Sequence, residues 1–167
     1  YPLRRQRQMC IRDSHKGLGN SNKIIFEIIN EINNHFKISI CSVDGGGLRN
    51  AIPRESTAII SFSKDNFELF EEIIKKSLDM YKKRFQLTDS DLNLEFKLLG
   101  NGLKQLSRED SNELIKAINM CPNGVFEMSK SIEGLVETSN NLANIKLVNG
   151  ELTVSYTHLR AHETKAN

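Results

Sequence analysis

The strongest constraint on the fold is a change of apolar spacing along residues 20–63. In residues 20–36 the apolar side chains recur with a period near 3.6, which predicts one amphipathic helix. Two runs rich in β-branched residues follow at residues 38–43 and 56–63, and they predict two strands. The segment between the strands reads "DGGGLRNAIPRE", Asp44 to Glu55. The apolar face of the helix is formed by Ile24, Ile25, Ile28, Ile29, Ile32 and Phe36.

The following residues continue this mixture of helices and strands. The spacing predicts a second helix over residues 65–85, a strand over residues 92–98 and a third helix over residues 107–120 that stops at Pro122. Two short strands are then expected on either side of an Asn149–Gly150 turn. This order predicts an α+β fold with an antiparallel sheet and helices on one face. No linker or repeat divides the segment, so we expect one domain.

The two ends of the chain differ in composition from the middle. One DNA element, read in opposite directions, can encode both Met9–Ser14 and Val154–Leu159. It resembles a transposon-type sequencing adapter, and translated scars of this kind are excluded from fold reasoning. We therefore expect residues 1–14 and 154–167 to be adapter sequence, and residues 15–153 to be the genuine domain.

The ends also determine the sign of the net charge. The whole chain has a formal charge of +2, but six of its basic and only two of its acidic residues lie in these ends. The middle is therefore slightly acidic and has no clustered basic face, which argues against a nucleic-acid partner. No apolar run approaches the length of a membrane span. Two cysteines remain in the middle, Cys41 and Cys121, and this usage fits a reduced cytoplasmic protein.

The glycine-rich segment has two readings on local grounds. A phosphate-binding loop needs its glycines between a strand and a helix, so that backbone N–H groups and the helix N-terminus face the anion. Here Pro53 and the β-branched run "STAII" follow, which predicts a strand instead. A connection between two antiparallel strands explains the glycines, but it does not explain the positions of Arg49 and Asn50.

Four blocks of sequence resemble one family in the same order. They are "HKGLGNSNKI" (His15 to Ile24), "GGGLRNAIPRE" (Gly45 to Glu55), "CPNGV" (Cys121 to Val125) and "GLVETSNNLANI" (Gly134 to Ile145). The family is that of the aminoacyl-histidine dipeptidases, also called cytosol non-specific dipeptidases, which are dinuclear-zinc metallopeptidases. The resemblance implies that residues 15–153 form the lid and dimerisation domain, with a sheet of about four antiparallel strands and helices on one face.

The resemblance also implies which residues contact substrate. Asn50 matches an asparagine that points at bound substrate in related lids, and its amide can both donate and accept hydrogen bonds. His15 is the second histidine of the family pattern G-H-S-G-x-x-I-H-x-G-L-G-N, and it is the other candidate for substrate contact. The first histidine of that pattern would lie where "CIRDS" now stands, and an arginine beyond the last block is missing too.

The metal centre of the family is expected to lie elsewhere. The resemblance implies two zinc ions and a general-base glutamate, whereas the middle of this chain has only His15 and His35 and no H-x-D pattern. Glu71 and Glu72 are adjacent on a predicted helix and so point to different faces. The resemblance therefore implies a metallo-dipeptidase whose zinc is bound by a missing catalytic domain, and we expect this chain alone to be inactive.

Two function classes follow from these observations. The first is a fragment of a cytoplasmic zinc dipeptidase that contributes a substrate-covering domain, with a dipeptide as substrate and a second copy as partner. The second is a stand-alone α+β binding or oligomerisation module without a catalytic role. Zinc motifs beyond both ends of residues 15–153 would favour the first class, and genuine stop signals would favour the second.

Overall fold

The computed structural model describes residues 17–100 and 102–160. Most of the predicted elements are present, and the α+β class is confirmed. In chain order the elements are α1 (Ser21–His35), β1 (Ser39–Gly45), β2 (Ser56–Ser61), the 3₁₀ helix η2 (Lys64–Asn66), α2 (Phe67–Arg84), α3 (Arg108–Met120), β3 (Gly124–Met128), β4 (Val136–Val148) and β5 (Glu151–Arg160).

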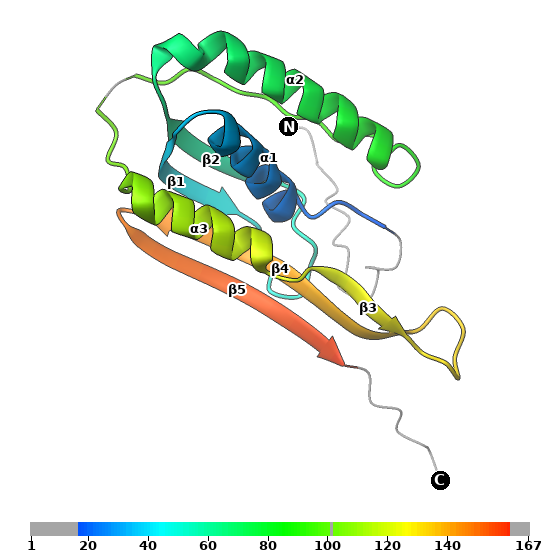
Figure 1. Cartoon of the computed structure of the whole chain (residues 1–167). Coiled ribbons are helices and arrows are strands. Elements are labelled where there is room, and N and C mark those ends of the chain that lie inside the picture. The colour runs from blue at the N-terminus through cyan, green and yellow to red at the C-terminus, as the bar shows by residue number, and fades with distance from the viewer. Residues whose placement is uncertain (1–16, 101, 161–167) are drawn as a thin grey trace, which may run out of the picture.

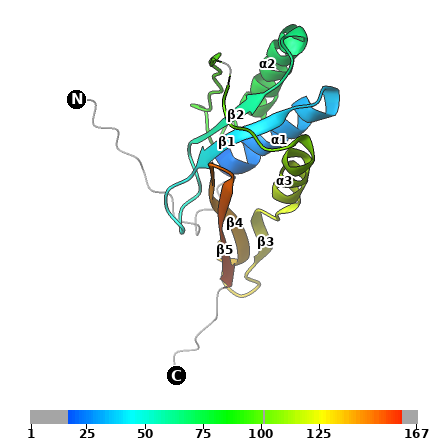
Figure 2. The same cartoon turned by 90° about the vertical axis from the view of Figure 1, so that its left-hand side faces the viewer.

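The described strands form one antiparallel sheet in the order β2–β1–β4–β3, with β5 on the remaining edge of β4. β4 is the organising strand because β1 and β3 pair with different halves of it. β1 pairs at Ile145–Leu147, and β3 pairs between Val136 and Asn140. Helices α1, α2 and α3 lie on one side of this sheet (Figures 1 and 2). The prediction of helices on one face is therefore confirmed, with five strands instead of about four.

The core lies between the sheet and the three helices. Helix α1 buries Ile28, Ile29 and Ile32 of the predicted apolar stripe, whereas the other three members of that stripe are only partly buried. Phe26, which the predicted stripe did not include, is fully enclosed. Strands β1 and β4 supply the opposite wall. Each of the enclosed apolar side chains contributes about 1.5–3 kcal/mol to folding. The largest are Phe26, Ile32, Ile38, Ile40, Ile115, Leu142, Ile145 and Leu147.

Polar contacts fix the ends of two helices against each other. The side chain of Asn20 caps α1 by accepting a hydrogen bond from the Lys23 backbone N–H at 3.1 Å. The Lys23 ammonium donates to the carbonyls of Ile118, Asn119 and Cys121 at the C-terminal end of α3, at 2.9, 2.9 and 3.1 Å. A cation is favourable at that end of a helix dipole. Burial is the main cause that lowers the pKa of Lys23.

The last strand extends into the segment expected to be adapter sequence. β5 continues to Arg160 and pairs with β4 from Glu151 onward. A strand can form from residues of any origin, so this pairing leaves the proposed boundary at residue 154 a prediction. Residues 1–16 and 161–167 lie outside the described part of the chain. Within the part that is described, no helix is long and apolar enough to span a membrane.

Two predictions about strands were wrong. Residues 92–98 have no strand, although Leu92 and Leu94 pack partly buried against the core. Apolar side chains of this extended segment contact α2 instead. The Phe96 ring packs edge-on against the Phe70 ring, with 5.2 Å between the two centroids. The missed strand is β3, which starts at Gly124 immediately after α3, where the sequence indicated only the end of a helix.

We expect alkaline pH to destabilise the domain through Tyr81. Its ring is 2% exposed, and its hydroxyl donates a 2.6 Å hydrogen bond to Glu27 Oε2. Burial, together with this hydrogen bond, raises the pKa of Tyr81 above its ordinary value of 10. Above about pH 10 the unfolded chain therefore loses a proton that the folded chain keeps, and stability falls by about 1.4 kcal/mol per pH unit.

Urea unfolding between pH 8 and pH 11 measures this slope, and Tyr81→Phe is the control. The variant keeps the ring but has no group to titrate, so its stability should fall less steeply than that of the wild type above pH 10. Equal slopes in the two proteins would show that Tyr81 does not contribute.

Candidate functional site

The connection between β1 and β2 presents the residues that the sequence singled out. It spans residues 46–55 between two antiparallel strands, so the reading as a strand connection is confirmed and a phosphate loop is excluded. The Ala51 N–H donates to the Leu48 carbonyl at 3.4 Å, which closes a β-turn. Arg49 and Asn50 are the two central residues of that turn, and both are exposed. In Figure 2 the connection extends on the side of the sheet away from α3.

The three glycines have different roles. A Cβ atom on Gly45 would lie 1.9 Å from Asn22 Oδ1, so the missing side chain makes room for a fully buried asparagine. Gly46 has a φ of +79°, and a Cβ there would lie 2.0 Å from the Ala143 carbonyl oxygen. Gly47 has nothing within 4 Å of its Cβ direction. The first two glycines are therefore required by close packing against α1 and β4, and the third is not.

Side chains of β4 and β5 donate hydrogen bonds to the backbone of the β1–β2 connection. Asn141 Nδ2 donates to the Ala51 carbonyl at 2.8 Å, and Asn144 Nδ2 donates to the Gly46 carbonyl at 2.8 Å. The Thr157 hydroxyl donates to the carbonyl of Arg49. Thr157 lies in the segment expected to be adapter sequence, so the support of the exposed turn is assigned to Asn141 and Asn144 of β4.

A cluster of three asparagines lies under the turn. Asn20 Nδ2 lies 3.0 Å from Asn141 Oδ1 and 2.9 Å from Asn123 Oδ1. The oxygen of Asn123 also accepts from the Leu142 N–H at 3.1 Å. Asn20 and Asn141 are 5% and 2% exposed, so these amides are effectively shielded from water. We refer to Asn20, Asn123 and Asn141 as the asparagine cluster.

Sequence reasoning did not single out the asparagine cluster. A signal was nevertheless present, because each of its members lies in a different one of the four blocks that carried the family resemblance. Asn20 lies in the first block, Asn123 in the third and Asn141 in the fourth, while the second block supplies the Ala51 carbonyl that Asn141 binds. Residues about 120 positions apart in sequence, such as Asn20 and Asn141, meet at one place.

The other candidate residues stand as follows. His15 lies outside the described residues. His35 lies at the exposed end of α1 and contacts Glu31 at 3.2 Å. Glu72 pairs with Lys76 on the exposed surface of α2 at 2.7 Å. Among residues 17–100 and 102–160, no group of three His, Cys, Asp or Glu side chains could hold a metal ion. The described residues therefore do not fit the two zinc ions that the resemblance implies.

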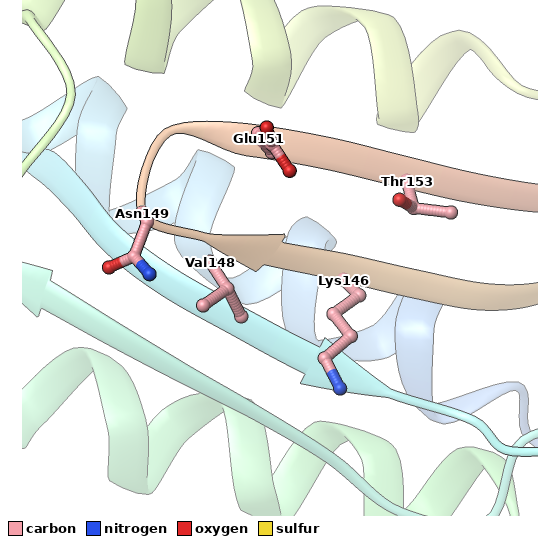
Figure 3. A pocket seen from close by; sticks show the side chains of 5 residues that line it. All are labelled: Lys146, Val148, Asn149, Glu151 and Thr153. Atoms are coloured by element: carbon pink, nitrogen blue, oxygen red, sulfur yellow. The ribbon is translucent and has the colours of Figure 1, made fainter.

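An open pocket of about 340 Å³ lies beside the turn between β4 and β5. Its lining side chains are shown in Figure 3. Lys146 and Val148 alternate with the buried Leu147, so they project from the face of the sheet opposite the helices. No residue that the sequence predicted to contact substrate lines it. The lining residues are Lys146, Val148, Asn149, Glu151 and Thr153.

Comparison with known families indicates a class of protein for this fold. The family model described as a peptidase dimerisation domain matches residues 9–86 of the chain. Residues 9–86 are therefore similar to the dimerisation domains found in peptidases.

Two individual proteins sharpen this assignment. The cytosol non-specific dipeptidase of Escherichia coli (strain K12) is 27% identical over 140 residues, which are 84% of this chain and 29% of that protein. The crystal structure of aminoacylhistidine dipeptidase from Vibrio alginolyticus superposes with a TM-score of 0.81 at 30% identity, covering 86% of this chain and 29% of that one. These likenesses confirm the resemblance to the aminoacyl-histidine dipeptidases. The chain spans less than a third of the length of either relative.

Proposed function

We propose that this chain is the substrate-covering and dimerising domain of a cytoplasmic, zinc-dependent dipeptidase that hydrolyses Xaa-His and other dipeptides. The match to a peptidase dimerisation domain and the two dipeptidase relatives support the proposal. The name of the Escherichia coli relative supports the cytoplasmic location, and the family description supports a homodimer. The role in substrate binding rests on one observation, which is that Asn50 lies exposed at the tip of a turn held from beneath.

Asn50 has the chemistry required for substrate contact. Its amide nitrogen can donate to a dipeptide carboxylate or carbonyl, while its amide oxygen can accept from the dipeptide amine. Within the described part of the chain, the Asn50 side chain has no hydrogen-bond partner, so both groups are available to an external ligand. A turn that is already held in place loses little conformational freedom on binding, which preserves affinity. His15 remains a second proposed contact.

The metal ions are assigned to a different part of the enzyme. Because the described residues do not fit a dinuclear zinc site, we place both ions and the water-activating carboxylate on the catalytic domain that the family resemblance implies. The present domain would then cover the dipeptide from the opposite side. Its own contribution would be to orient the substrate and exclude water from it.

We expect the 167-residue chain by itself to bind no stoichiometric zinc and to hydrolyse no Xaa-His dipeptide, because its described residues hold no group of side chains that could bind a metal ion. Metal analysis of the purified chain and an assay of dipeptide cleavage measure both quantities. The full-length enzyme that contains this domain is the positive control and should do both. Retention of one or two zinc ions per chain after removal of residues 1–14 and 154–167 would contradict the proposal.

A further inference from the structure

We infer that Asn141 is a positioning residue that holds Asn50 in the orientation needed for substrate contact, and that Asn20 orients Asn141. This inference rests on the proposed function of Asn50. The contact acts through the backbone, because Asn141 Nδ2 donates to the carbonyl of Ala51, the residue that follows Asn50 and closes the β-turn. Loss of this bond would release the side of the turn on which Asn50 lies.

The asparagine cluster gives the Asn141 amide only one useful orientation. Its oxygen accepts from Asn20 Nδ2 at 3.0 Å, which leaves its nitrogen facing the Ala51 carbonyl. Asn20 is oriented in turn, because its own oxygen accepts from the Lys23 N–H at the start of α1. The directions of the Asn20 and Asn141 amides therefore follow from a backbone group at the start of a helix. A buried amide that is fully hydrogen-bonded is costly to rearrange.

The same contacts join the four sequence blocks that carry the family resemblance. One block supplies the helix cap, one supplies the turn, and the other two supply Asn123 and Asn141. No member of the asparagine cluster is close to another in sequence, so the arrangement exists only in the folded domain. Its one hydrogen bond to the turn that carries Asn50 is made by Asn141. We therefore assign the cluster to the geometry of the turn, in addition to the general stability of the fold.

The first test compares two variants of the 167-residue chain, in each of which one asparagine is replaced by serine. Asn141→Ser removes the donor to Ala51. Asn119→Ser is the matched control, because the Asn119 amide donates to the Phe26 and Ile115 carbonyls of α1 and α3 instead of the turn. Trypsin cleavage of the Arg49–Asn50 bond reports opening of the turn. We expect Asn141→Ser to accelerate this cleavage at least about tenfold, the ratio expected from a buried hydrogen bond of ordinary strength. Asn119→Ser should change it less than about twofold at equal global stability.

A second variant guards against simple unfolding. Asn20→Ser keeps a residue that caps helices well, but it removes the donor that orients Asn141. It should also accelerate cleavage at Arg49–Asn50 and increase hydrogen exchange at Ala51, while α1 stays protected. Equal acceleration in Asn141→Ser and Asn119→Ser, or an unchanged rate in both cluster variants, would overturn the inference.

A kinetic arm separates this inference from the proposed function. In the full-length enzyme, Asn141→Ser should lower kcat/KM, and it should add almost nothing when combined with Asn50→Ala, since it acts through that residue. Additive losses would overturn the positioning role. Faster cleavage in Asn141→Ser combined with a silent Asn50→Ala would instead overturn the substrate contact and leave the support of the turn in place.

Discussion

Asn50→Ala is expected to lower kcat/KM for dipeptide hydrolysis by about 30- to 1,000-fold in the full-length enzyme. A hydrogen-bond donor removed from a water-excluded site typically costs about 2–4 kcal/mol, and each ~1.4 kcal/mol corresponds to one decade in rate. Asn50 is exposed at the tip of its turn and makes no contact that the fold requires among the described residues. Zinc content and folding should therefore remain unchanged.

The loss should appear in kcat as well as in KM. Closure of the domain over substrate would form the Asn50 contact mainly as the transition state is approached, and such interactions affect turnover. Arg49→Ala is the matched control, because Arg49 is the other central residue of the same β-turn and the hydrogen bond that closes this turn joins the backbones of Leu48 and Ala51. Steady-state kinetics at saturating zinc decide the matter. A kinetically silent Asn50→Ala would mean that the stretch is a structural turn only.

Gly46→Ala is expected to destabilise the domain by about 2–5 kcal/mol. The left-handed backbone at φ +79° costs a residue with a side chain about 1–2 kcal/mol, and overpacking typically adds 1–3 kcal/mol. The added methyl would lie 2.0 Å from a backbone oxygen of β4, which cannot move aside as a flexible side chain could. The displaced loop would also strain the Asn144 contact to the Gly46 carbonyl.

The neighbouring glycine provides the control. Gly47→Ala introduces a methyl into open space, so its stability should change by less than about 1 kcal/mol and can increase slightly through a less flexible unfolded chain. Thermal unfolding of both variants should separate them by roughly 6–15 °C, given about 3 °C per kcal/mol for a domain of this size. Comparable melting temperatures would show that the loop adapts and that the three glycines are equivalent.

The elements with strong periodicity were predictable from the sequence. Helix α1 begins and ends within one residue of its predicted limits because its isoleucines repeat at helical spacing and Asn20 caps it. The Asn149–Gly150 turn was also predictable, since both residues adopt positive φ values of 54° and 88°. The strand predicted for residues 92–98 was wrong because alternating leucines fit either a strand or an extended segment that packs against a helix. β3 was missed because its five residues depend on pairing with β4.

The candidate site was predictable only in part. The family resemblance pointed to Asn50, but nothing local distinguishes that asparagine from its neighbours in the sequence. The asparagine cluster could not be derived from the sequence, because its hydrogen bonds join residues that are 103 and 121 positions apart. The separate roles of Gly45, Gly46 and Gly47 likewise depend on what lies opposite each one in the fold.

The bond between Asn141 and Ala51 has a consequence for the order of folding. It closes a loop of 90 residues, and contacts of such high sequence separation form late, because the entropy of loop closure must be overcome first. During synthesis β1 and β2 leave the ribosome well before β4 does. The turn at Arg49 and Asn50 thus acquires its final shape only after nearly the whole domain has been made, so a partly synthesised domain would not present Asn50 in its substrate-binding orientation.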